Sequence, residues 1–151
     1  MKCLLFCLLA AILLHTQCYA DATKLRPGIR QVLLDVSRFH EVRSNAQLPA
    51  GVVALCADNN GMIADPGEPW QIGCVGDDNS PKTRLIWAAI AGELYVVHYE
   101  SGGIVHRFHV LVATFKECDT SATVEWRSVA KLFKNYGEFV AALETNRLEA
   151  R

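Results

Sequence analysis

Apolar residues recur at two different spacings along the chain, and each spacing predicts a different kind of element. Residues 27–43 repeat apolar side chains every three or four positions, which predicts an amphipathic helix with Pro27 in its first turn. Residues 48–58 predict a shorter helix, which the sequence Asn59, Asn60 and Gly61 would end because these residues tolerate the left-handed conformation.

In the centre of the chain the apolar residues follow the pattern of β-strands. We expect strands at residues 84–90, 93–100, 104–115 and 122–132, the third being the longest, with a glycine-rich hairpin turn at residues 101–103. The last strand is expected to direct to one face Val124, Trp126, Ala130 and Leu132.

A further helix is predicted after the strands. Asn135, followed three residues later by Glu138, is typical of a helix start, and Phe139, Val140 and Leu143 would form the buried stripe. The expected fold class is therefore α+β, an antiparallel β-meander of four to five strands flanked by an N-terminal and a C-terminal helix.

Residues 61–81 separate the second predicted helix from the strands. They contain four glycines and three prolines, which predict a long ordered loop with a short strand at residues 70–75. Long loops in compact domains are more often functional or disulfide-held than idle, so this loop is a candidate binding segment.

The first 20 residues have the pattern of a secretory signal peptide. Lys2 precedes an apolar run at residues 3–14, and the small residue Ala20 precedes Asp21. A run of 12 apolar residues would span about 18 Å as a helix, less than the roughly 30 Å of a bilayer core. We expect cleavage after Ala20, a periplasmic or secreted location, and a single domain over residues 21–151.

Charge narrows the classes of partner. Without the leader the chain carries 14 basic and 16 acidic residues, a net charge of about −2, which argues against nucleic acid or an anionic membrane as the main partner. Residues 44–81 contain no Lys or Arg, but they do contain Asp58, Asp65, Glu68, Asp77 and Asp78. This segment is either a solvated acidic loop region or an acidic surface for a basic partner.

Three cysteines remain after the leader, and they are Cys56, Cys74 and Cys118. In an oxidising compartment they allow three alternative single disulfides. The preferred pairing is Cys56 with Cys74, because it closes a shorter loop and would hold an otherwise irregular stretch. The cysteine spacing resembles no zinc motif.

Candidate chemical groups flank the predicted hairpin turn, and they include His98, Glu100, Ser101, His106 and His109. A three-residue turn would place His98 across from His106, where two imidazoles and Glu100 could hold a metal. A two-residue turn would move His106 to the other face and remove this site. Acid–base catalysis and a serine triad are further options, and ordinary polar sheet residues are the simplest interpretation. We expect no cofactor and no metal.

In the layout of the whole chain, the sequence resembles the periplasmic immunity proteins of type VI secretion peptidoglycan-amidase effectors. The shared features are a cleavable leader, about 130 further residues, an α+β pattern, few cysteines and acidic loops. The resemblance implies a protein that is not an enzyme but blocks a cell-wall hydrolase by inserting a protruding loop. The residues expected to bind the partner are Asp65, Glu68, Trp70, Asp77, Asp78, Glu100 and Ser101.

Two alternatives come from other classes. One is a small secreted metal-dependent hydrolase that uses His98, Glu100 and His106. The other is a structural envelope protein. The metal content of the purified protein tests the first alternative, and a neighbouring gene for a secreted amidase would support the immunity interpretation.

Overall fold

The computed structural model describes residues 24–75 and 79–148. The leader expected at residues 1–20 lies outside the described residues, and so do Asp77 and Asp78. Of the helices in the described part of the chain, none combines the length and the apolar character needed to cross a membrane.

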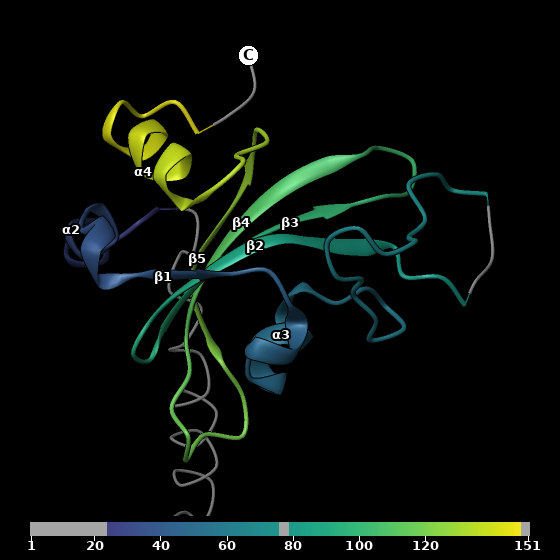
Figure 1. The fold of residues 1–151 in the computed structure, drawn as a ribbon, viewed down its shortest axis with the longest axis horizontal. Helices are drawn as coiled ribbons and strands as arrows, with labels where there is room; N and C mark the ends of the chain where they lie inside the picture. The colour runs from purple at the N-terminus through teal and green to yellow at the C-terminus, as the bar shows by residue number, and fades with distance from the viewer. Residues whose placement is uncertain (1–23, 76–78, 149–151) are drawn as a thin grey trace, which may run out of the picture.

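The described residues form an antiparallel sheet of five strands in the order β1-β2-β3-β4-β5 (Figure 1). The strands are β1 (His40–Val42), β2 (Thr83–Ala91), β3 (Leu94–Ser101), β4 (Arg107–Thr114) and β5 (Thr123–Ala130). Helices α2 (Pro27–Leu34) and α3 (Ala50–Cys56) precede β2, and α4 (Tyr136–Glu144) follows β5. The predicted α+β meander with helices on both sides in sequence is confirmed.

The first helix ends earlier than its apolar pattern predicts. Helix α2 stops at Leu34, a single 3₁₀ turn follows at Val36–Arg38, and the chain then forms β1. Strand β1 pairs with β2, with Val42 opposite Ala88. The predicted continuation of the helix to residue 43 is therefore wrong, because pairing at the edge of the sheet overrides the local helical periodicity.

Two β-bulges reverse the alternation of strand side chains between the two faces of the sheet. One lies in β2 at Ile86 and the other in β5 at Glu125, where the strand registers shift. A bulge adds one residue, so positions two apart across it face opposite sides. Val124 therefore packs in one core and Trp126 in the other. The predicted shared face for these residues is wrong, and Leu132 is half exposed.

The first core lies between the sheet and the helices α2 and α4. Trp87 and Phe133 are among its fully buried side chains. The predicted start of the last helix is confirmed, because Asn135 Oδ1 accepts a hydrogen bond from the Glu138 N–H at 2.9 Å. The predicted buried stripe of that helix is confirmed for Phe139, Val140 and Leu143.

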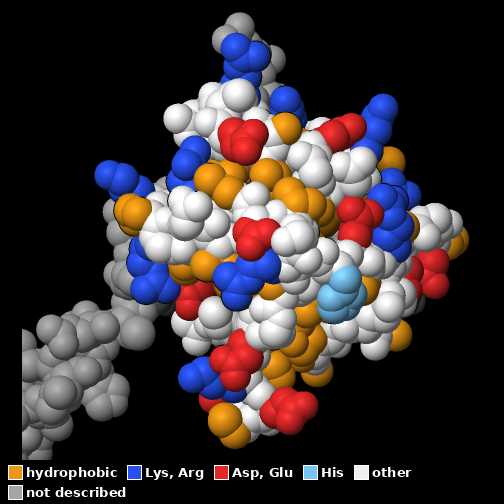
Figure 2. Space-filling view, turned by 60° about the vertical axis from the view of Figure 1, so that its left-hand side comes forward, with side chains coloured by type: hydrophobic (Ala, Val, Ile, Leu, Met, Phe, Trp, Pro, Cys, Tyr) orange, Lys and Arg blue, Asp and Glu red, His pale blue; other side chains and the backbone are white. Residues whose placement is uncertain are grey.

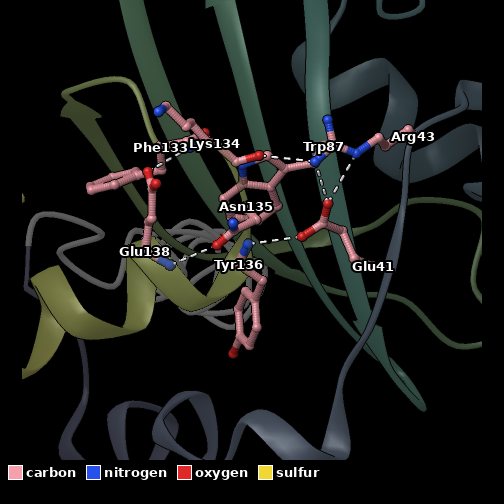
Figure 3. A network of polar contacts seen from close by, with 8 residues as sticks. All are labelled: Glu41, Arg43, Trp87, Phe133, Lys134, Asn135, Tyr136 and Glu138. Carbon is pink, nitrogen blue, oxygen red and sulfur yellow. Dashed lines mark hydrogen bonds and ion pairs between the residues drawn. The ribbon is translucent and has the colours of Figure 1, made fainter.

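Figure 3 shows how β1 holds the start of α4. Glu41 Oε2 accepts a hydrogen bond from the Tyr136 N–H at 2.9 Å, while Glu41 Oε1 accepts one from Arg43 at 2.7 Å. Arg43 also donates to the Lys134 carbonyl at 2.9 Å. Glu41 thus satisfies a backbone N–H that a helix start leaves without an intrahelical partner. Through these contacts residues 40–43 position the start of α4, which a first helix extended to residue 43 could not do.

The second core lies on the opposite face of the sheet, under α3. Val52 and Cys56 of this helix are buried against sheet residues. The predicted short helix is confirmed, although it covers only Ala50–Cys56. All three cysteines are free in the described structure: Cys56 is 2% exposed, whereas Cys74 and Cys118 are exposed. The expected bridge between Cys56 and Cys74 is thus not formed there.

The segment between α3 and β2 is irregular but anchored. Ala64 forms an isolated parallel bridge with Arg84, beyond the short strand β1 on the same edge of β2. Asp58 accepts hydrogen bonds from the backbone N–H of Lys82 at 2.7 Å and of Met62 at 3.0 Å. Burial opposes ionisation of Asp58, but these backbone bonds prevail and its pKa is lowered. The long loop is therefore ordered by its own polar groups.

The side of the molecule that carries α2 and α4 has a mixed surface. Figure 2 shows Lys and Arg side chains spread among Asp and Glu on this side, with hydrophobic side chains between them. This arrangement is typical of an ordinary solvated surface. The candidate site lies at the opposite end of the sheet, away from α2 and α4.

Candidate functional site

The two loops singled out from the sequence meet at one end of the molecule. The Gly103 N–H donates to the Ile72 carbonyl at 2.7 Å, and the Gly102 N–H donates to the Lys82 carbonyl at 2.8 Å. We call residues 71–75 together with residues 102–106 the tip. In Figure 1 the teal loop lies beside the ends of β3 and β4, on the side away from α2 and α4.

In the tip the structure differs from two predicted elements, the short strand at residues 70–75 and the hairpin turn at residues 101–103. Residues 70–75 form no strand, so that prediction is wrong; the loop is instead held by bonds such as Gln71 N–H to the Pro81 carbonyl at 2.8 Å. Strand β4 begins only at Arg107, which pairs with Ser101, and β2 is the longest strand. Both hairpin registers considered above are wrong, because residues 102–106 form a five-residue connection against the neighbouring loop.

Gly102 allows the two loops to approach closely. A Cβ atom at this position would lie 2.2 Å from the Gln71 carbonyl oxygen and 2.6 Å from the Ile72 carbonyl oxygen. These are backbone atoms, which cannot move aside as the end of a flexible side chain can. Only glycine fits here without separating the loops.

Four apolar side chains of the tip are exposed to solvent. The exposed fraction is 94% for Ile104, 91% for Val75, 53% for Val105 and 52% for Ile72. The sequence reasoning missed all four. Their signal in the sequence is that apolar residues occur inside glycine-rich loops, where polar residues are usual.

A buried carboxylate supports the tip from below. Glu100 is 4% exposed, and its Oε1 accepts hydrogen bonds from the Arg84 guanidinium, the shorter contact being 2.6 Å. Its other oxygen, Oε2, lies 2.6 Å from His106 Nε2. His106 is the last residue of the tip, so Glu100 connects this loop to β2 and β3. Charge-assisted contacts of this length are among the stronger hydrogen bonds in proteins.

Trp70 packs against the same group. The Arg84 guanidinium lies 4.9 Å from the centre of the Trp70 ring, and the Trp70 and His106 ring centroids are 5.7 Å apart. Stacking of this kind is favourable for arginine on an indole face. We call Trp70, Arg84, Glu100 and His106 the brace. It brings together Trp70 and Glu100, which the sequence assigned to two separate loops.

The expected acidic contact residues also have partners within the chain. Asp65 accepts hydrogen bonds from the Asn45 N–H at 2.6 Å and from the Ser44 hydroxyl at 2.9 Å. Glu68 accepts one from the Asp65 N–H at 2.9 Å. These hydrogen bonds help to shape the loop.

His98 is removed from any solvent-facing site. It is fully buried, with Nδ1 2.8 Å from the His109 carbonyl and Nε2 3.1 Å from the Phe133 N–H. A carbonyl only accepts and an N–H only donates, so the ring is neutral with its proton on Nδ1. Burial lowers the pKa of His98 to about 4. Both ring nitrogens are therefore occupied by the backbone, and His98 is not available to a metal alongside Glu100 and His106.

Ser101 contacts His109, and not the buried His98 that a triad with Ser101 and Glu100 would use. Its hydroxyl lies 2.8 Å from His109 Nε2, and the His109 ring stacks on Tyr99. Burial lowers the pKa of His109, and the charges of Arg127 and Arg107 lower it further. A general base must become positively charged when it accepts a proton, and these arginines oppose that step. The contact between Ser101 and His109 therefore fits a structural role better than a catalytic one.

The remaining chemistry of the site is limited within the described ranges. There, no group of three or more His, Cys, Asp or Glu side chains is arranged to hold a metal ion. The arrangement instead offers a firmly held, protruding surface. Comparison of the chain with known proteins finds no matching family model, no matching curated protein and no matching solved structure.

Proposed function

We propose that this protein is an exported inhibitor, of the immunity-protein type, that binds and blocks a cell-wall hydrolase with its tip. The observation that carries the proposal is the meeting of two loops in one protruding surface with four exposed apolar side chains. Exposed apolar clusters on otherwise polar surfaces mark sites of protein interaction.

Two features of the sequence support the same proposal. The pattern of residues 1–20 fits export to the compartment where cell-wall hydrolases act. Residues 44–81 carry acidic side chains and no Lys or Arg, which favours a basic partner. An inhibitor of standard interface size would bury on the order of 1,600 Å² in total and would need no chemistry of its own.

The mechanism would be steric. The tip would enter the substrate cleft, and the sheet behind it would keep the peptidoglycan strand out. Because the loops are already bonded to each other, little conformational entropy would be lost on binding. Inhibition should therefore be stoichiometric, reversible and independent of added metal.

Purified hydrolases test the proposal. The exported protein, whose N-terminus is expected at Asp21, is titrated into peptidoglycan-digestion assays with a panel of amidases and lysozyme-type muramidases. We expect complete inhibition of at least one enzyme at a one-to-one ratio. Failure to inhibit or bind any of them would overturn the proposal.

A secreted metal-dependent hydrolase remains the second candidate, because Glu100 and His106 lie in direct contact at 2.6 Å. The engaged nitrogens of His98 count against this candidate. Metal analysis of the purified protein together with a hydrolysis assay of His106→Ala separates the two. Stoichiometric metal and activity that is lost in this variant would favour the enzyme.

A further inference from the structure

We infer that the tip binds its partner by inserting Ile104 and Val75 into an apolar pocket bordered by basic residues, with Trp70 and Glu100 acting as positioning residues. This inference rests on the proposed inhibitor function and names the chemistry of the surface that the tip would recognise. It also assigns the binding energy to residues that the sequence reasoning did not select.

Two side chains of the tip are almost fully exposed. Ile104 and Val75 are 94% and 91% exposed, so almost their entire side chains are available to a partner. Ile72 and Val105 are about half exposed and lie next to the backbone bond between Ile72 and Gly103. Single exposed apolar residues are ordinary, but these four lie on two loops that are bonded to each other, and their burial by one partner would be favourable.

The polar side chains near the tip are already bonded within the chain. Glu100 is buried between Arg84 and His106, and Ser101 is bonded to His109. Trp70 is only partly exposed and lies over the Arg84 guanidinium. A partner that bound Glu100 directly would have to break its contacts with the brace, which would cost more than burying free apolar side chains.

The two loops of the tip are held in place by close contacts. Gly102 packs against the backbone of residues 71 and 72, and the brace fixes His106 at the end of the other loop. A preorganised pair of loops presents its apolar side chains at a fixed spacing. This suits insertion into a preformed pocket better than adaptive wrapping around a partner.

The acidic residues near the tip indicate which side chains of the partner would surround the pocket. The loop that leads to the tip carries Asp58, Asp65 and Glu68, and residues 44–81 contain no Lys or Arg. Of the cations next to the tip, Lys82 lies beside Asp58, Arg84 contacts Glu100, and Arg107 follows the tip in the chain. The carboxylates of Asp65 and Glu68 would be complementary to Lys and Arg side chains at the rim of the partner's cleft. The apolar centre and charged rim together match the usual anatomy of a protein interface.

The test uses a hydrolase from the panel above that the wild-type protein inhibits. Ile104→Ser and Val75→Ser are each expected to weaken binding about thirtyfold or more, as truncation of a central anchor does. Val36→Ser and Val129→Ser are the matched controls, because these valines are 46% and 49% exposed outside the tip. The controls should bind within about twofold of wild type, and the unfolding midpoint of every variant is measured alongside.

A double-mutant cycle tests the positioning role. Trp70→Ala should weaken binding in the wild-type background but cause no further loss in Ile104→Ser/Val75→Ser, because it acts only through the tip. Trp70→Phe, which retains a ring over Arg84, should restore most of the affinity. Losses that multiply would show that Trp70 contacts the partner itself and would overturn its positioning role.

The other outcomes are distinguishable. Inhibition that survives Ile104→Ser and Val75→Ser would overturn this inference and leave the inhibitor function standing. A protein that binds no hydrolase would overturn both. Tip-dependent binding to phosphatidylglycerol vesicles, or tip-dependent dimerisation without hydrolase binding, would replace the hydrolase pocket with a lipid surface or a second copy.

Discussion

His98 ties three parts of the chain together at the scale of a single residue. Its Nδ1–H donates to the His109 carbonyl on β4, and its Nε2 accepts from the Phe133 N–H between β5 and α4. The ring also packs against Trp87, with centroids 5.2 Å apart. The neutral ring fits both bonds, whereas a protonated ring has no lone pair for the Phe133 N–H.

Acid should therefore destabilise the protein through His98. Its pKa is about 4 in the folded protein and 6.5 in a free histidine, so the unfolded chain binds the proton more tightly. The contribution to stability is complete above pH 6.5 and is lost as the pH falls through about 4. The total loss is about 3 kcal/mol by linkage. Urea unfolding measured from pH 7.5 to pH 3.5 checks this expectation.

The variant His98→Leu isolates the effect. It leaves the His109 carbonyl and the Phe133 N–H unpaired in the core, so at pH 7 it should be about 2–4 kcal/mol less stable than wild type. The difference in unfolding free energy between the two proteins should shrink as the pH falls, because protonation of His98 destabilises only wild type. His40→Gln, at an exposed position on β1, should follow the wild-type profile. A pH profile that is unchanged in His98→Leu would refute the role.

At this scale the sequence predicted the candidate site only in part. It singled out the two loops that meet in the tip and named Trp70 and Glu100 within them. It could not show that these two residues support the surface instead of forming it, because their partner Arg84 lies 16 positions from Glu100 and meets it only in the sheet. It also favoured polar side chains, although the exposed surface of the tip includes Ile104 and Val75.

At the scale of elements, the tip is two loops that behave as one unit. The close approach at Gly102 and the bond from Gly103 to Ile72 join them. Neither loop has regular secondary structure, so their stability depends on this junction.

Gly102→Ala should separate the loops. The added Cβ would meet the Gln71 and Ile72 carbonyl oxygens, so we expect a loss of about 1–3 kcal/mol in unfolding free energy. Amide hydrogen exchange in residues 71–75 should also become faster. Gly73→Ala is the matched control in the same loop, because its nearest neighbour would be Val75 N at 4.0 Å. Equal effects of the two substitutions would contradict the proposed junction.

The elements were predicted well where local signals and tertiary contacts agree. The class of the fold, the meander and the Asn135 start of α4 all follow from periodicity and capping. Other features did not follow, among them the early end of α2 and the bulges at Ile86 and Glu125. Each depends on a neighbouring strand that is distant in sequence, and a bulge reverses the period-two pattern without leaving a mark in composition.

Charge acts at the scale of the whole molecule. The sequence has a formal net charge of only −1, but residues 44–81 carry five acidic residues and no Lys or Arg. Such an asymmetric distribution influences how a charged partner approaches more than how tightly it is held.

Glu68→Gln tests this long-range effect. The amide oxygen can still accept the Asp65 N–H, so the loop should keep its shape while losing one negative charge. We expect association with a basic hydrolase to slow by about twofold at low salt, with a flatter salt dependence and an unchanged dissociation rate. Glu144→Gln on α4, an element on the side of the molecule away from the tip, should slow association less, because the charge that it removes lies farther from the contact surface. Stopped-flow measurements at several ionic strengths distinguish these results.

The burial of Cys56 determines whether its thiol can form a disulfide. A disulfide requires two sulfur atoms about 2 Å apart and an attacking thiolate. Once α3 has packed, Cys56 is 2% exposed and burial raises its pKa to about 12, while Cys74 lies exposed in the tip. The folded protein would therefore keep Cys56 as an unreactive thiol until it next unfolds, whatever oxidant surrounds it.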